Sequence, residues 1–137
     1  MLRVKLVMPE GEVWAGPADR VVAKTLDGDI GILTGHSPVL GVLAPASVVR
    51  ILPLEGDDGQ PASAWIDAAV GGGFLSVADD RVSILARQAI LGADVDRAAA
   101  RAEISAATAG AAAGGDARDA AAVEYLRAQL RAAGDQT

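Results

Sequence analysis

The sequence predicts two structural parts, a β-sandwich or barrel over residues 1–86 and a helical hairpin over residues 87–137. Valine, which favours strands, is concentrated in the first part, and that part also holds all six prolines. Alanine, which favours helices, dominates the second part, where proline is absent. Turn signals also divide the first part into short segments, which is typical of all-β domains.

The first part is predicted to contain eight to ten short strands. Leu2, Val4 and Leu6 alternate with Arg3 and Lys5, as in a strand that buries one face. The other expected strands cover residues 12–15, 19–25, 30–33, 39–43, 47–52, 64–70, 74–78 and 81–86. We expect Gly16-Pro17 to break the chain between the second and third strands. The three glycines at 71–73 indicate a bulge or a close backbone approach.

The second part is predicted to form two antiparallel helices. Asp94 or Asp96 can cap a first helix that runs to about Ala109, and residues 110–115 form a hinge of small residues. Asp116 can cap a second helix, which Gly134 ends. The second helix carries one narrow apolar stripe, made of Val123, Leu126 and Leu130. Because such a hairpin buries little apolar area, a movable hairpin and a permanently docked one are equally compatible with the sequence.

Composition excludes several classes of function. The chain has no cysteine and one histidine, which excludes a disulfide framework, a thiol nucleophile and a multi-histidine metal site. A net charge of −6 argues against a nucleic-acid partner. No apolar run approaches the roughly 20 residues that cross a bilayer, and no secretory signal is expected.

The remaining chemical candidates are better explained as structure. The glycine-rich segments at 28–31 and 71–73 lack the lysine of a phosphate-binding loop. His36 has no nucleophile and orienting carboxylate placed to complete a catalytic set. The aspartates at the hairpin tips are typical turn residues. The residues alone therefore predict a scaffold or interaction protein with no catalytic residue and no metal site.

A specific resemblance covers nearly all of the first part. Residues 28–40, Gly-Asp-Ile-Gly-Ile-Leu-Thr-Gly-His-Ser-Pro-Val-Leu, closely resemble the signature of the ε subunit of F-type ATP synthases. The opening Pro-Glu-Gly-x-Val-Trp-x-Gly that ends at Gly16 is similar to the same family. So is the segment 70–86, which contains Val-Gly-Gly-Gly-Phe-Leu-Ser-Val.

The resemblance implies a flattened ten-stranded β-sandwich followed by two antiparallel helices. It also implies a non-catalytic rotor subunit of the central stalk, at the cytoplasmic face of a bacterial cell membrane. The implied partners are the γ subunit, the ring of c subunits and, transiently, the catalytic head of α and β subunits. Such a subunit fastens γ to the ring for proton-driven ATP synthesis, and it meets the membrane only through the complex.

The resemblance further implies residues for the contact with the ring. Asp29 stands where the family has a glutamate, and His36 matches the family histidine. Gly31 and Gly35 lie in the same segment, so we expect a tight loop that presents Asp29 and His36 at one end of the sandwich.

Two further roles of the hairpin follow from the resemblance. The basic residues of the second helix that could meet the catalytic head and inhibit ATP hydrolysis are Arg118, Arg127 and Arg131. A nucleotide motif of some members, in a shifted register, falls on Asp94, Asp96 and Arg97. ATP at the hairpin therefore stays an open alternative, and no other cofactor is expected.

A second class of function is also compatible with the residues. The chain could be a stand-alone ligand-binding β-sandwich with a helical interaction tail. Such a protein needs an apolar, aromatic-lined pocket, and the chain has only one Phe, one Tyr and two Trp to line one. Binding to γ distinguishes the two classes.

Overall fold

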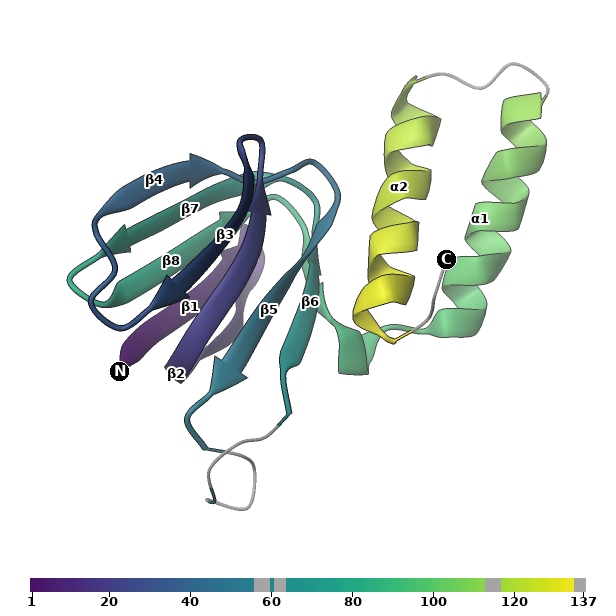
Figure 1. Ribbon diagram of the computed structural model, residues 1–137. Helices are drawn as coiled ribbons and strands as arrows, with labels where there is room; N and C mark the ends of the chain where they lie inside the picture. The colour runs from purple at the N-terminus through teal and green to yellow at the C-terminus, as the bar shows by residue number, and fades with distance from the viewer. Residues whose placement is uncertain (56–59, 61–63, 113–116, 135–137) are drawn as a thin grey trace.

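A computed structural model of the chain describes residues 1–55, 60, 64–112 and 117–134, without the side chains of residues 110–119. Within these residues, nine strands form one hydrogen-bonded sheet, and two helices follow them (Figure 1). The strands are β1 (Leu2–Met8), β2 (Gly11–Thr25), β3 (Gly28–Leu33), β4 (Val39–Val42), β5 (Ser47–Pro53), β6 (Ile66–Val70), β7 (Gly73–Ala78), β8 (Arg81–Ala86) and β9 (Ala89–Leu91). A 3-10 turn η1 (Gly92–Asp94) leads into α1 (Arg97–Ala112) and α2 (Ala117–Ala132).

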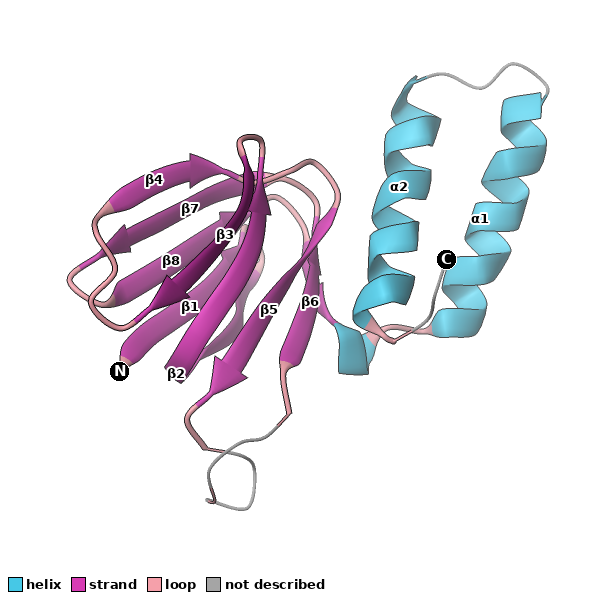
Figure 2. Cartoon of the chain, in the orientation of Figure 1, coloured by secondary structure: helices cyan, strands magenta, loops and turns pink. Residues whose placement is uncertain are grey.

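The strands run in the order β4-β7-β8-β1-β2-β5-β6-β9, and β3 pairs with β2. The sheet folds over, so that its two halves face each other across one aliphatic core. Leucine, isoleucine and valine side chains from both halves are fully buried there, among them Leu6, Ile32, Ile51, Leu75 and Ile84. The predicted fold class, a β-sandwich followed by two contacting helices, is confirmed (Figure 2).

The expected break at Gly16-Pro17 is wrong, because β2 passes through it as one strand of 15 residues. The first half of β2 pairs with β1, and its second half pairs with β5 and β3. A register shift between Ala18 and Arg20 absorbs the bend between these two halves. Two of the nine expected strand segments are therefore one strand, and the unexpected strand β9 brings the number among the described residues back to nine, against the ten that the resemblance implies.

The glycines at 71–73 behave as the sequence predicts. Gly73 has a φ of 129°, and a Cβ on it would lie 2.0 Å from the carbonyl oxygen of Leu85. Only glycine fits this approach of β7 to β8. The sheet also continues past residue 86, because β9 pairs with β6 inside the segment that the sequence assigns to the helical part.

The hairpin packs on the sheet through α2, and α1 packs on α2. Asp96 Oδ1 accepts a hydrogen bond of 3.0 Å from the amide of Ala99, so Asp96 is the expected cap of α1. Helix α1 continues past the expected end near Ala109, and Gly134 follows α2 with a φ of 93°. Part of the expected hinge at 110–115, and the expected cap Asp116, lie outside the described residues.

Candidate interaction sites

The loop that carries His36 is held in place from another strand pair. The amide of Gly35, whose φ is 84°, donates a hydrogen bond of 2.7 Å to Asp80 Oδ1 in the β7–β8 turn. The amide of His36 donates to the Leu33 carbonyl at 3.1 Å, and His36 Nδ1 lies 2.7 Å from the Ser37 carbonyl oxygen. Asp80 therefore braces the loop, and His36 is half-buried at its surface.

Asp29 does not share this loop, contrary to the expected placement of both residues at one end of the sandwich. The segment Gly28–Leu33 is strand β3, with Asp29 opposite Lys24 and Gly31 opposite Val22 of β2. A six-residue strand is about 20 Å long, and its extended backbone separates Asp29 at its start from the His36 loop after its end. Alternation in this segment puts Ile30 and Ile32 inward, so the segment is a strand rather than a loop.

Asp29 instead lies near the hairpin. A groove of about 440 Å³ runs beside α2, and its lining includes Asp29 and Arg131. Arg50 and Asp67 also line this groove, and they form an ion pair in which Arg50 Nε lies 3.0 Å from Asp67 Oδ1. The guanidinium of Arg50 lies over the Trp65 ring. The structure thus brings a residue expected at the ring and a residue expected at the catalytic head to one groove.

The other candidate arginines of α2 are placed differently. Arg127 Nε lies 3.9 Å from Glu124 Oε1, one helical turn away, on the same flank as Arg131. The side chain of Arg118 lies outside the described residues.

Two of the three residues predicted to bind a nucleotide stabilise the base of the hairpin. Arg97 donates a hydrogen bond through Nη2 to the carbonyl of Ala133, just after α2. Asp96 caps α1, and Asp94 belongs to the turn η1 and is exposed. Binding of ATP by these three residues stays a prediction, which calorimetry with Mg-free ATP tests.

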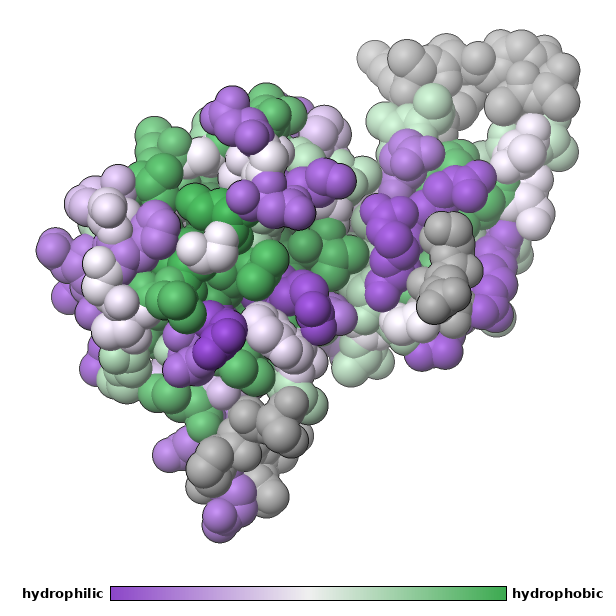
Figure 3. All heavy atoms as spheres, viewed as in Figure 1, coloured by the Kyte–Doolittle hydropathy of each residue, from purple (hydrophilic) through white to green (hydrophobic). Residues whose placement is uncertain are grey.

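The contact of the hairpin with the sheet is built from small side chains. Ala128 and Ala132 of α2 are buried against Ala69 of β6, and the partly buried residues at the border are Ala46, Val48, Ile90 and Tyr125. A Cβ on Gly92 would lie 2.0 Å from the carbonyl oxygen of Ala132, so the end of α2 touches the backbone of η1. Figure 3 shows that the visible side of both helices is largely hydrophilic.

The predicted apolar stripe of α2 serves a different contact. Residues 128 and 130 are about 200° apart on a helix, so Leu130 points away from the sheet contact that buries Ala128. Leu130 is fully buried, and besides the sheet and η1 the element that packs on α2 is α1. The stripe therefore joins the two helices, while the alanines join the hairpin to the sheet.

Tyr125 is the titratable group that reports on this contact. Desolvation in the contact raises the pKa of the Tyr125 hydroxyl above its ordinary value of 10.0. Burial disfavours the charged phenolate, so an increase in pH above that value disfavours the docked hairpin.

A second surface, which the sequence analysis missed, lies on the outer side of β4, β7, β8 and β1. Val42, Phe74, Leu85 and Val7 are consecutive partners across these four strands, and they form a row that we call the apolar row. Phe74 and Leu85 are 53% and 54% exposed, and Val42 is 44% exposed. Leu40 extends the row on β4 with 74% of its surface exposed. Several large apolar side chains exposed side by side mark a contact surface.

The sequence contained a signal for the apolar row. A strand with one side in water alternates apolar and polar residues, as β1 does over Leu2–Lys5. In contrast, Phe74-Leu75 of β7 and Ile84-Leu85 of β8 are adjacent apolar pairs, and neighbours along a strand point to opposite faces. Strands that are apolar on both faces indicate a sheet that is covered on both faces.

The described residues contain no group of His, Cys, Asp and Glu side chains able to hold a metal ion. In the same residues, each buried polar side-chain atom has a hydrogen-bond partner. None of the described helices is both long enough and apolar enough to span a bilayer.

The fold and these surfaces define a small interaction subunit, a β-sandwich that carries a helical hairpin. Residues 1–92 match the family described as "ATP synthase, Delta/Epsilon chain, beta-sandwich domain". The ATP synthase epsilon chain of Thermobifida fusca is 50% identical over 133 residues, which cover 96% of this chain and 91% of that one. The epsilon chain of Frankia casuarinae is 50% identical over 90 residues, covering 66% of this chain and 96% of that one. The chain therefore belongs to the ATP synthase epsilon-chain family, which confirms the predicted identity as a non-catalytic subunit.

Two solved structures share the fold. A chain in the Euglena gracilis mitochondrial ATP synthase structure of OSCP, F1 and c-ring superposes with a TM-score of 0.75 and 22% identity. That match covers 98% of this chain and 81% of the other. A chain in the Tetrahymena thermophila mitochondrial ATP synthase central stalk and c-ring structure gives a TM-score of 0.54 and 24% identity over 74% of this chain and 70% of the other.

Proposed function

We propose that this chain is a rotor subunit of the ATP synthase central stalk, which fastens the γ subunit to the ring of c subunits for proton-driven ATP synthesis. The relatives named as epsilon chains support a place in ATP synthase. A similar fold in a structure titled as a central stalk and c-ring supports a place in the stalk. The chain would then work at the cytoplasmic face of the bacterial membrane and meet the membrane only through the complex.

The observation that carries this proposal is the apolar row. Val42, Phe74 and Leu85 are exposed on a sheet whose inner side is already packed, so the fold itself gives them no partner. Covering them with another chain removes apolar surface from water, which is the main driving force of association. A stalk subunit that turns with γ needs such a permanent contact, and we assign the γ subunit to the apolar row.

The contact with the ring is assigned to the segment that contains the family signature. The His36 loop is braced by Asp80 and presents one imidazole at the surface, together with Gly35. Asp29 and Gly31 lie on β3, at a distance from that loop. In this proposal the ring contacts the chain at two separate polar positions, the His36 loop and Asp29 on β3, rather than at one loop tip.

The test is formation of a complex with γ from the same synthase. Purified chain and γ should co-elute as one complex in size-exclusion chromatography. Membranes reconstituted without this chain should lose proton-driven ATP synthesis and regain it when the chain is added. A monodisperse chain that ignores γ would favour the alternative, a stand-alone ligand-binding β-sandwich.

We also propose that the hairpin, expected over residues 87–137 but beginning after β9, acts as a separate unit on the sandwich, and that it inhibits ATP hydrolysis when it leaves the sheet. Its contact with the sheet is centred on three buried alanines, with Val48, Ile90 and Tyr125 only partly buried around them, and this small fully buried area supports release at low cost. Arg127 and Arg131 lie on one flank of α2 and would meet the catalytic head, together with Arg118.

Truncation tests the inhibitory role. The shortened chain should end at Asp94 rather than at residue 86, because β9 belongs to the sheet. In a reconstituted enzyme, this truncation should raise ATP hydrolysis and leave the complex with γ intact. Unchanged hydrolysis would remove the inhibitory role and leave the coupling role in place.

A further inference from the structure

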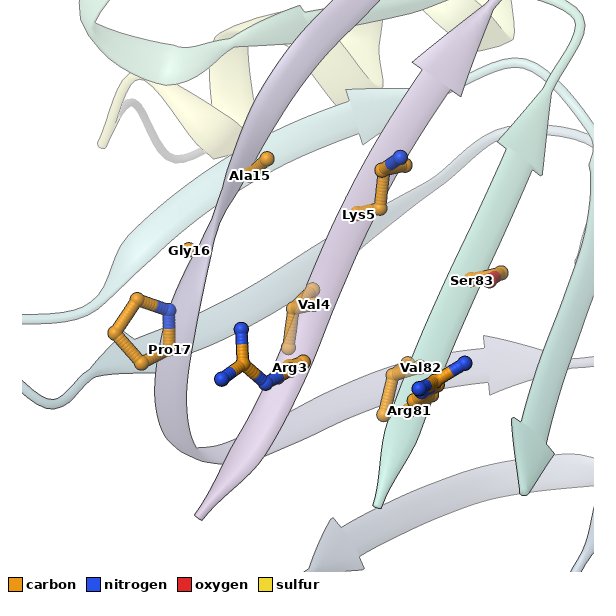
Figure 4. A pocket seen from close by; sticks show the side chains of 9 residues that line it. All are labelled: Arg3, Val4, Lys5, Ala15, Gly16, Pro17, Arg81, Val82 and Ser83. Carbon is orange, nitrogen blue, oxygen red and sulfur yellow. The ribbon is translucent and has the colours of Figure 1, made fainter. Parts of the chain in front are cut away.

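Three basic side chains gather on the same outer face as the apolar row. Arg3 on β1 and Arg81 on β8 are direct partners across the parallel strand pair, and Lys5 follows two residues later on β1. They line a groove of about 460 Å³. Figure 4 shows that Ala15, Gly16 and Pro17 of β2 lie beside them, and these small residues keep the groove open. We call Arg3, Lys5 and Arg81 the basic row.

The basic row has no anionic partner within the described part of the chain. None of its three side chains makes an ion pair or a side-chain hydrogen bond with a described residue. Asp80, which precedes Arg81, uses its Oδ1 to accept the hydrogen bond from Gly35. Like charges directly opposite on neighbouring strands destabilise a sheet. Since the whole chain has a net charge of −6, this cluster of cations does not follow from composition.

The basic row and the apolar row belong to one continuous surface. Arg81, Ser83 and Leu85 alternate along β8 on the outer side, and Ser76 and Ser83 are partners between the two rows. Two residues along a strand span about 7 Å, so the two rows are about 13 Å apart. One segment of a partner chain is wide enough to touch both.

The groove suits carboxylates better than a bound phosphate. Strands β1 and β8 both lie inside the sheet, each with a hydrogen-bonded neighbour on either side, so their backbone amides are engaged in the ladder. Phosphate sites usually recruit free backbone amides, which are not offered here. The ligand must therefore be recognised by side-chain cations alone, next to a large apolar surface.

We propose that the basic row binds carboxylates of an acidic, partly apolar segment of the γ subunit, whose apolar side chains cover Phe74 and Leu85. This inference rests on the proposed function, because it names the chemistry of the γ surface that meets the same face. The basic row supplies specificity and orientation, and the apolar row supplies most of the buried area.

The test measures the affinity of the full-length chain for purified γ at low and high salt. Arg3→Glu and Arg81→Glu place a carboxylate against the expected carboxylates, and each should weaken binding about tenfold or more at low salt. The double variant should lose most of the salt dependence.

Arg20→Glu is the matched control for these two variants. Arg20 is an exposed arginine of β2 on the other outer face, opposite Leu52 of β5 and ion-paired with Asp19 at 2.9 Å, and its variant should bind γ as wild type does. Circular dichroism checks that each variant is folded, and Arg81→Gln replaces any variant that is not.

The outcomes separate this inference from the proposed function. If the wild-type chain does not bind γ, the proposed function fails. If all variants bind γ with wild-type affinity and salt dependence, the inference is overturned and docking of γ stands. A third measurement tests sedimentation of the chain with vesicles of phosphatidylglycerol and phosphatidylcholine. Sedimentation of wild type but not of Arg3→Glu with these vesicles, at unchanged affinity for γ, would assign the basic row to anionic lipid and contradict the proposal.

Discussion

The two outer faces of the sandwich are covered in different ways. The face of β5 and β6 is covered by the chain's own helix α2, through a buried centre of three alanines and a partly buried border that includes Val48, Ile90 and Tyr125. The face of β4, β7 and β8 is left open, although it carries Phe74 and other large apolar side chains. Apolar stabilisation scales with buried area, so an alanine contact is weak and a Phe–Leu contact is strong. This difference is the basis on which we propose a releasable cover on one face and a permanent partner on the other.

The open face should show the largest effect of a single substitution. Phe74→Ala removes an aromatic side chain from the centre of the expected interface, and such losses cost about 2 kcal/mol or more, a decrease in affinity of about 30-fold. The melting temperature of the free chain should hardly change, because Phe74 is exposed. Titration calorimetry with γ measures the affinity. A Phe74→Ala variant that binds γ as tightly as wild type would remove the apolar row from the interface.

On the covered face, one added methyl group should disrupt the contact between α2 and the sandwich. In Gly92→Ala, the new Cβ would lie 2.0 Å from the Ala132 carbonyl oxygen, a backbone atom that cannot move while α2 stays docked. We expect the hairpin to detach while the sandwich stays folded. The chain has no cysteine, so thiols introduced at Asp27 and Ser105 can carry a fluorescent donor and acceptor, and energy transfer between them should change.

Gly31→Ala is the control for this variant, because a Cβ there meets no atom within 4 Å. It should leave the energy transfer unchanged. Equal transfer in wild type and Gly92→Ala would mean that the hairpin tolerates the substitution, and it would contradict the docking contact described above.

Substitutions in and around the His36 loop distinguish a residue that stabilises the fold from a residue that contacts a partner. Asp80→Ala removes the acceptor for the Gly35 amide and a residue that tolerates a φ of 61°, so it should lower the free energy of unfolding by about 1–2 kcal/mol. Asp80→Asn keeps an acceptor oxygen and should cost less. His36→Ala should change stability by less than about 0.5 kcal/mol, as expected for a surface contact residue. Denaturant melts measure all three, and a large loss in His36→Ala would make His36 a brace of the fold.

The smallest effect is the pH dependence of the docked hairpin. The docked state keeps its full Tyr125 contribution below pH 10.0 and loses it as pH rises through the raised pKa of that hydroxyl. Tyr125 is the only tyrosine in the chain, so the absorbance of its phenolate reports this site alone. The midpoint should be higher in wild type than in Gly92→Ala. Identical midpoints would show that docking does not desolvate Tyr125.

Local patterns predicted much of the fold. The alternation in β1, the Asp96 cap and the glycines at 71–73 depend on neighbouring residues, so the sequence displays them directly. The continuity of β2 through Gly16-Pro17 could not be read in this way, because strand partners on both sides hold it. The three-residue strand β9 is too short to carry a pattern, and its pairing with β6 defines it.

The candidate sites were predictable only in part. The family signature pointed to Asp29 and His36, but the alternation of Ile30 and Ile32 makes that segment a strand and separates the two. The basic row combines Arg3 and Arg81, residues far apart in the sequence that only the parallel pairing of β1 and β8 brings together. The groove with Asp29 and Arg131 likewise requires the docked position of α2.

Protection of a thiol on the open face tests the γ interface at the surface itself. Leu40→Cys lies at the apolar row, where the leucine is 74% exposed, and Ser105→Cys, at an exposed position of α1, is its control away from that row. Maleimide labelling rates are compared for free chain and for chain bound to γ. We expect strong slowing at position 40 and unchanged labelling at position 105. Equal labelling at position 40 with and without γ would show that this face is not the γ interface.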